Sequence, residues 1–81
     1  MKEKLKVYTV VVRADAVTCY DIEAHSGQEA ERLFLGMEEY GILCPYQDLQ
    51  ESFFWEVDHF KEASHPRNPI PYEESVKYLA S

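Results

Sequence analysis

Three stretches of the chain have the two-residue period of a β-strand, and the stretch between the second and the third has the spacing of a helix. The first, residues 5–13, is rich in β-branched residues and apolar on both faces, which is typical of a strand at the centre of a sheet. The second, residues 17–25, alternates between apolar and polar positions. The pattern therefore predicts an antiparallel hairpin whose second strand is half-buried.

Residues 26–41 carry the start signal, the apolar stripe and the stop signal of one helix. Ser26 and Glu29 form a capping box, in which each side chain is expected to accept a hydrogen bond from the backbone amide of the other residue. Gly41 can adopt the left-handed conformation that ends a helix. The positions expected to pack on the sheet are Ala30, Leu33, Phe34, Met37 and Tyr40. The positions expected at the polar surface are Glu29, Glu31, Arg32, Gly36, Glu38 and Glu39.

The third strand is expected at residues 51–60, after a connection that Pro45 keeps irregular. Its alternation places Phe53, Trp55 and Val57 on one face and Phe54, Glu56, Asp58 and Phe60 on the other. A crossover through the helix makes this strand parallel to the second one. The sequence thus predicts an α+β protein of ββαβ type, with a three-stranded sheet of order 2-1-3 on one helix.

The last part of the chain is rich in proline, with Pro66, Pro69 and Pro71 in an extended linker before a short helix within residues 71–81. We therefore predict a ββαβ domain at residues 1–62 and a tail at residues 63–81. Because one helix covers only one face of a sheet, we expect the tail to pack on the opposite face. Docking onto a second copy or onto another protein is the alternative.

The length of 81 residues is that of one domain, and no stretch approaches the roughly 20 apolar residues of a membrane span. The apolar run near the N-terminus is short and strand-like, unlike a secretory leader, so a cytoplasmic protein is expected. The net charge is −7, and between residues 15 and 62 twelve acids face only Arg32 and Lys61. Such a surface repels nucleic acid, so no direct nucleic-acid binding is expected.

Few residues point to chemistry. The sequence has no glycine-rich phosphate loop and no nucleophile with a matching base, so we predict a protein without catalytic activity. The possible metal ligands lack the spacing of familiar sites, and neither a metal nor a cofactor is expected. They are His25, His59, His65, Cys19 and Cys44. Two pairs of carboxylates lie on strands and could act in hydrolysis, but such pairs are more often the solvated side of a sheet.

Leu35 lies outside the apolar stripe of the helix and is surrounded by carboxylates. Single exposed leucines are common in proteins. Alternatively, Leu35 anchors a protein partner while the acids match its basic residues and occupy the positions of phosphates. The candidate partner-binding residues, including the two strand pairs, are Glu31, Leu35, Glu38, Glu39, Asp21, Glu23, Glu56 and Asp58.

The strand KVYTVVV, the run YDIEAHS, the helix QEAERLF and the strand FFWEVDHF together resemble the small DpnD/PcfM-like proteins of phages and mobile elements, over residues 4–60. The resemblance implies a fold and a mobile-element setting without an activity. In size and charge the chain is also similar to anti-CRISPR and anti-restriction proteins. We therefore expect an inhibitor that blocks a nucleic-acid-binding defence complex in the host cytoplasm by charge mimicry. The alternative is an accessory protein that self-associates through the open sheet face or the tail.

Overall fold

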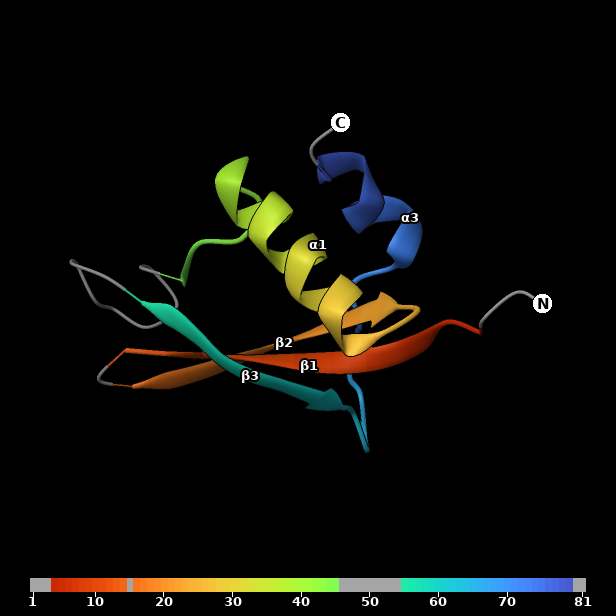
Figure 1. Cartoon of the computed structure of the whole chain (residues 1–81), viewed down its shortest axis with the longest axis horizontal. Coiled ribbons are helices and arrows are strands. Elements are labelled where there is room, and N and C mark those ends of the chain that lie inside the picture. Colours follow the sequence, from red (N-terminus) through yellow and green to blue (C-terminus); the bar gives the residue numbers. More distant parts are fainter. Residues whose placement is uncertain (1–3, 15, 46–54, 80–81) are drawn as a thin grey trace.

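The computed structural model describes residues 4–14, 16–45 and 55–79. Its sheet consists of β1 (Lys6–Arg13), β2 (Val17–Ala24) and β3 (Glu56–Glu62) in the order β2-β1-β3. The central strand β1 is antiparallel to both neighbours, as Figure 1 shows. The predicted α+β class, strand order and strand directions are confirmed.

One face of the sheet forms the core together with α1 (Gly27–Glu39). Val10 and Val12 of β1 and Ile22 of β2 are fully buried on this face, as their alternating positions predict. From α1, the stripe of Ala30, Leu33, Phe34 and Met37 is buried against them. The ring of Phe34 also meets the edge of Trp55, with the ring centroids 5.5 Å apart. The helix is thus held mainly by one apolar stripe on an apolar sheet face.

Both ends of α1 follow the sequence signals, with one difference. The Ser26 hydroxyl accepts a hydrogen bond from the Glu29 amide at 3.1 Å, as predicted. The Glu29 carboxylate, however, accepts from the His25 amide at 2.8 Å, one residue earlier than predicted. The backbone of Ser26 is extended. Because of this conformation, the amide of the preceding residue, His25, also points toward the first turn of the helix. The predicted second half of the capping box is therefore replaced by a bond to His25.

The C-terminal end of α1 is closed by Gly41, whose φ of 76° is the left-handed conformation that glycine adopts readily. The Gly41 amide donates to the Glu38 carbonyl at 2.9 Å, and the Ile42 amide donates to the Met37 carbonyl at 2.8 Å. These two bonds form a Schellman motif. The predicted stop at Gly41 is confirmed.

Two residues of the predicted helix lie on a different surface from the predicted one. Tyr40 is 65% exposed, because it follows the last turn of α1 and stacks on Tyr78 instead of the sheet. Gly36, expected at the polar surface, is buried because the C-terminal part of the chain packs on it.

The third strand differs from the prediction in its bounds and in one side chain. Within the described residues β3 begins at Glu56 and continues to Glu62, and the predicted positions 51–54 lie outside those residues. Val12 pairs with Val57 and Val11 with His59, so Asp58 is an extra residue in a β-bulge. The bulge reverses the alternation, and Phe60 therefore lies on the helix side, against Gly27. The prediction that Phe60 shares a face with Glu56 is wrong for this reason.

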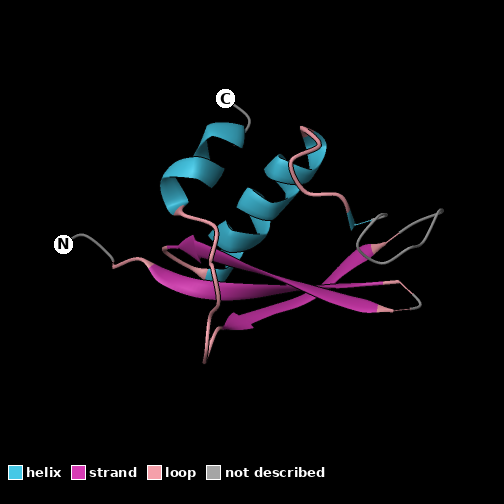
Figure 2. Cartoon of the chain, turned by 180° about the vertical axis from the view of Figure 1, so that it is seen from behind, coloured by secondary structure: helices cyan, strands magenta, loops and turns pink. Residues whose placement is uncertain are grey.

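The tail packs within the same chain, but on the side of α1. The linker after β3 passes the sheet on the side away from α1 (Figure 1). Ile70 then joins the outer edge of β2 by a parallel bridge to Ile22. The short helix α3 (Tyr72–Ser75) and the 3-10 turn η1 (Val76–Tyr78) follow beside α1, and both Figures 1 and 2 show all the helices on one side of the sheet. The predicted packing of the tail on the opposite face is therefore wrong.

The reason lies in the two faces of the sheet. On the open face, which we define as the face turned away from α1, the central residues Thr9 and Val11 are only 8% and 6% exposed. The centre of the open face thus offers little apolar area to a covering helix, whereas the helix side accommodates the apolar residues of the tail. In the described residues, no helix is long and apolar enough to cross a membrane.

Candidate functional site

The predicted partner-binding residues fall on two surfaces separated by the sheet. Glu31, Leu35, Glu38 and Glu39 lie on α1. Asp21, Glu23, Glu56 and Asp58 lie on β2 and β3, at positions that alternate with the core residues and so belong to the open face. The structure therefore does not bring the eight residues together into one site.

The carboxylates of the open face mostly bind other parts of the same chain. Asp21 accepts a hydrogen bond of 2.6 Å from the hydroxyl of Thr9 on the neighbouring strand. Asp58 lies 2.7 Å from the Nδ1 atom of His59 and 3.8 Å from the guanidinium of Arg13.

Glu23 extends to the edge of the sheet, where its carboxylate accepts a hydrogen bond of 3.1 Å from the Tyr72 amide. Glu56 is the exception on this face, since it is exposed and its carboxylate has no hydrogen bond or ion pair within the described part of the chain. Three of the four sheet carboxylates thus have an evident structural role.

Three of the four carboxylates of α1 differ in this respect, whereas the fourth, that of Glu29, accepts a hydrogen bond from the His25 amide and lies beside the His25 ring. Within the described residues, the side-chain carboxylates of Glu31, Glu38 and Glu39 form no hydrogen bond or ion pair. Glu38 and Glu39 also lie in the last turn of α1, which contains no basic residue. The helix macrodipole is negative at this end and disfavours a carboxylate there by roughly 0.3–1 kcal/mol. These charges therefore do not stabilise the fold and are available to a partner.

Leu35 lies at a hollow between α1 and the end of the C-terminal segment, which we define as residues 70–79. The Leu35 side chain is 43% exposed. The hollow has a volume of about 280 Å³ and opens to solvent. Its lining residues are Arg32, Leu35, Gly36, Glu39 and Leu79. The predicted anchor residue is thus part of a concave surface with two leucines and two charged residues of opposite sign.

Gly36 allows the C-terminal segment to form one wall of this hollow. A Cβ atom at this position would lie only 2.4 Å from the carbonyl oxygen of Tyr78, closer than non-bonded atoms can approach. The missing side chain therefore lets the backbone of η1 lie directly on α1. Beside it, the rings of Tyr40 and Tyr78 pack with their centroids 5.7 Å apart.

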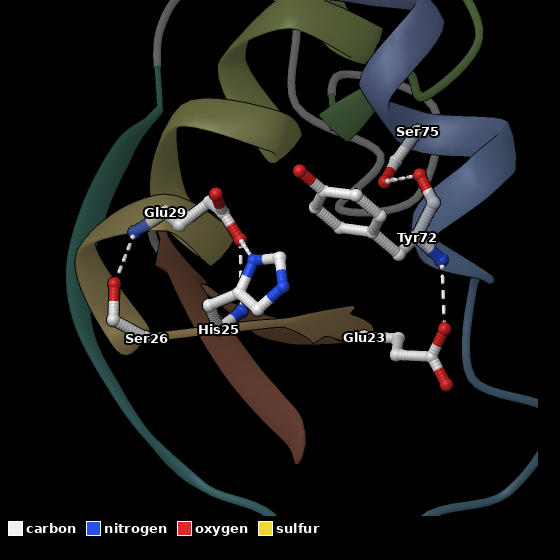
Figure 3. Close-up of polar contacts among 6 residues, drawn as sticks. All are labelled: Glu23, His25, Ser26, Glu29, Tyr72 and Ser75. Carbon is white, nitrogen blue, oxygen red and sulfur yellow. Dashed lines mark hydrogen bonds and ion pairs between the residues drawn. The ribbon is translucent and has the colours of Figure 1, made fainter. Parts of the chain in front are cut away.

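The C-terminal segment is held in place at its other end by a polar cluster, shown in Figure 3. The Ile70 carbonyl accepts from the Glu23 amide, and the Ile70 amide donates to the Asp21 carbonyl, both at 2.9 Å. The ring of His25 lies 2.9 Å from the Glu29 carboxylate and meets the ring of Tyr72 edge-on, with the centroids 4.8 Å apart. These contacts fix the position of the first residues of α3. As a result, Leu79 lines the same hollow as Leu35.

The buried Ser75 completes the polar cluster, because its hydroxyl donates to the Tyr72 carbonyl at 3.2 Å. This hydrogen bond lies within the short helix. Without it, the buried hydroxyl would be an unpaired polar group. The cluster has a structural role, and its residues belong to three separate elements.

Sequence reasoning missed three residues that line the hollow, namely Arg32, Gly36 and Leu79. Of these, only Gly36 carried a signal. A glycine in the middle of a helix costs about 1 kcal/mol relative to alanine, so its presence indicates close approach of another segment. The contribution of Leu79 could not be seen without the fold.

Other chemical features are sparse in the described part of the chain. It contains no group of three or more His, Cys, Asp or Glu side chains that could hold a metal ion. Cys19 and Cys44 are free thiols. The pKa of Lys6 is raised because its ammonium group donates to the Glu62 carboxylate at 3.2 Å and is attracted by its charge.

Comparisons with protein-family models, with curated proteins and with solved structures find no match for this chain.

Proposed function

We propose that the chain is a non-catalytic protein-binding module whose contact surface is the exposed side of α1. The observation that carries this proposal is the exposed Leu35, which lines a hollow and has nearby carboxylates without partners in the described structure. Protein interfaces commonly combine an apolar centre with a charged rim. This surface has the same arrangement.

The charge of the surface indicates a basic partner. The chain has a net charge of −7, and the acids of α1 exceed the single base Arg32. Proteins that bind nucleic acid present arginine and lysine for phosphates, and a row of carboxylates on a rigid helix can take the place of those phosphates. Binding of this kind is fast and weakens as salt is added.

Inhibition of a nucleic-acid-binding defence complex in the host cytoplasm is the biological role that suits such a surface. The resemblance to DpnD/PcfM-like proteins and the similarity in size and charge to anti-CRISPR proteins support a phage or mobile-element setting. No pocket chemistry is required, because an inhibitor of this kind acts by occupying the surface that binds nucleic acid.

The decisive variant reverses the charge of three residues on α1, Glu31→Lys, Glu38→Lys and Glu39→Lys. We expect it to lose binding to the partner entirely while its circular dichroism spectrum stays unchanged. Binding is measured by size-exclusion chromatography with light scattering, with candidate DNA-binding defence complexes at low and high salt. The wild-type protein should co-elute with one complex and be released by salt.

A matched control reverses three exposed acids outside α1, Glu56, Glu62 and Glu73, because both triple variants change the net charge from −7 to −1. We expect this control to keep most of the binding, since the charges of α1 are intact. Retained binding by the α1 variant would refute the proposal. A stable dimer that binds none of the complexes would favour the alternative, a self-associating accessory protein. The nearly buried centre of the open face provides little apolar area for such self-association.

A further inference from the structure

We propose that the hollow between α1 and the C-terminal segment takes one aliphatic side chain of the partner, and that this side chain is flanked by basic residues. The inference rests on the proposed function and specifies the partner's recognition element. It also makes the C-terminal segment part of the binding site.

The aliphatic character follows from the walls of the hollow. Leu35 of α1 and Leu79 of the C-terminal segment both line it, together with Gly36, which has no side chain, and the charged residues Arg32 and Glu39 of α1. A volume of about 280 Å³ can hold one branched aliphatic side chain. Inserting it would remove the exposed apolar surface of Leu35 from water, which is the main source of favourable free energy at an apolar contact.

The basic flanks follow from the charges around the hollow. Glu39 lines it, Glu38 is its neighbour in the last helical turn, and Glu31 lies one turn before Leu35. Arg32 is the single cation among these residues, so the carboxylates prevail. A lysine or arginine on the partner would also relieve the unfavourable position of Glu38 and Glu39 at the negative end of α1.

The C-terminal segment contributes the wall that distinguishes this hollow from a bare helix surface. Leu79 reaches the site only because η1 lies directly against Gly36. Binding of the aliphatic side chain therefore depends on the docked position of the C-terminal segment. A variant that alters no charge can test this dependence.

The first test uses synthetic peptides and amide NMR spectra of the labelled full chain. The probe is a peptide with a central leucine between two pairs of lysines, and the matched peptide has serine in place of leucine. We expect the leucine peptide to shift the amide signals of Leu35, Gly36 and Leu79 and to bind about tenfold more tightly than the serine peptide, the ratio expected for partial burial of a leucine.

Equal affinity of the two peptides, or the absence of shifts at the hollow with the leucine peptide, would overturn the inference. The proposed function would still stand if both peptides shifted Glu31, Glu38 and Glu39 and were displaced by salt. The two proposals can therefore fail separately.

The second test is Gly36→Ala, which adds a methyl group where the Tyr78 carbonyl lies and favours the helix itself. We expect α1 to stay folded, the C-terminal segment to shift away, and the preference for the leucine peptide over the serine peptide to fall from about tenfold to near unity. Gln28→Ala, at an exposed position near the start of α1, is the matched control and should keep the preference. An unchanged preference in Gly36→Ala would show that the segment is not part of the site.

Discussion

The carboxylates of the open sheet face and those of α1 are alike in sequence and different in structure. On the sheet, Asp21, Glu23 and Asp58 accept hydrogen bonds or ion pairs from other elements of the chain. On α1, Glu38 and Glu39 face solvent without such partners in the described structure and lie at the helix end where their charge is unfavourable. Each of these acids contributes one negative charge, but only those of the second group are free for another molecule.

The comparison teaches that an excess of acids does not by itself locate a binding surface. A carboxylate that already accepts hydrogen bonds must lose them to meet a partner, and that loss offsets much of the new interaction. A carboxylate that lies near other carboxylates and has no cation beside it is stabilised when a partner brings a cation to it. The number of hydrogen bonds and ion pairs that an acid forms within the chain therefore distinguishes structural acids from candidate binding acids. Its position in the sequence is a poorer guide.

The largest expected effect on stability comes from Asp21→Ala. The hydroxyl of Thr9 is almost buried and donates to Asp21, so the variant leaves it without an acceptor, at a cost of about 1–3 kcal/mol in the free energy of unfolding. Urea denaturation measures the change. Asp21→Asn, which keeps an acceptor oxygen, should lose less.

The same measurement on Glu38→Ala provides the contrast between the two surfaces. We expect a change within about 0.5 kcal/mol, as is usual for a surface side chain without contacts. If Glu38→Ala destabilised the protein as much as Asp21→Ala, the division into structural and free carboxylates would be wrong.

An intermediate effect is expected for Glu23→Ala, which removes the acceptor of the Tyr72 amide. We expect a loss of about 0.5–1.5 kcal/mol and faster hydrogen exchange of the Tyr72 amide, because the start of α3 is less firmly held. Hydrogen exchange followed by NMR measures this directly, and Glu23→Gln serves as the control that keeps the acceptor. Unchanged exchange in Glu23→Ala would mean that the Ile70 bridge alone positions the segment.

The smallest effect on stability is expected for Lys6→Met, which removes the partner of the Glu62 carboxylate. This variant tests whether an ion pair alone is enough for a carboxylate to stabilise the fold. Lys6 pairs with Glu62, but their side chains are 58% and 60% exposed, and exposed ion pairs contribute little. We expect no measurable change in the urea midpoint at pH 7.

The pH dependence of this pair has a defined sign. The pKa of Lys6 is raised above its usual value of 10.5 by Glu62, so any stabilisation is present below that pH and is lost as the pH rises through the raised pKa. A clear loss of stability in Lys6→Met at pH 7 would show that burial is not required for a structural carboxylate.

Much of the fold could be predicted from local patterns. The alternation of β1 and β2, the apolar stripe of α1 and the caps at Ser26 and Gly41 depend on neighbours within a few residues, and the structure confirms them. Most of the errors arise where a distant element decides. Phe60 changes sides because Asp58 forms a bulge opposite Val11, and Tyr40 leaves the stripe because Tyr78 lies beside it.

The candidate site could be predicted only in part. Leu35 stood out because an apolar residue lay among acids on the polar side of a helix. The hollow could not be foreseen, since it requires Leu79 to lie against Gly36, and these residues are far apart in sequence. The engagement of Asp21 and Glu23 was likewise hidden, because their partners Thr9 and Tyr72 belong to other elements.

The sequence by itself determined the class of fold, the strand order and the position of the helix, because hydrophobic periodicity and capping act through local geometry. Only the tertiary structure decided which acids are free and on which side the tail lies. The physical reason is that β2 has an open edge for Ile70 and that the helix side has apolar surface left to cover, while the centre of the open face is already buried. These properties exist only after β1 has been placed between β2 and β3.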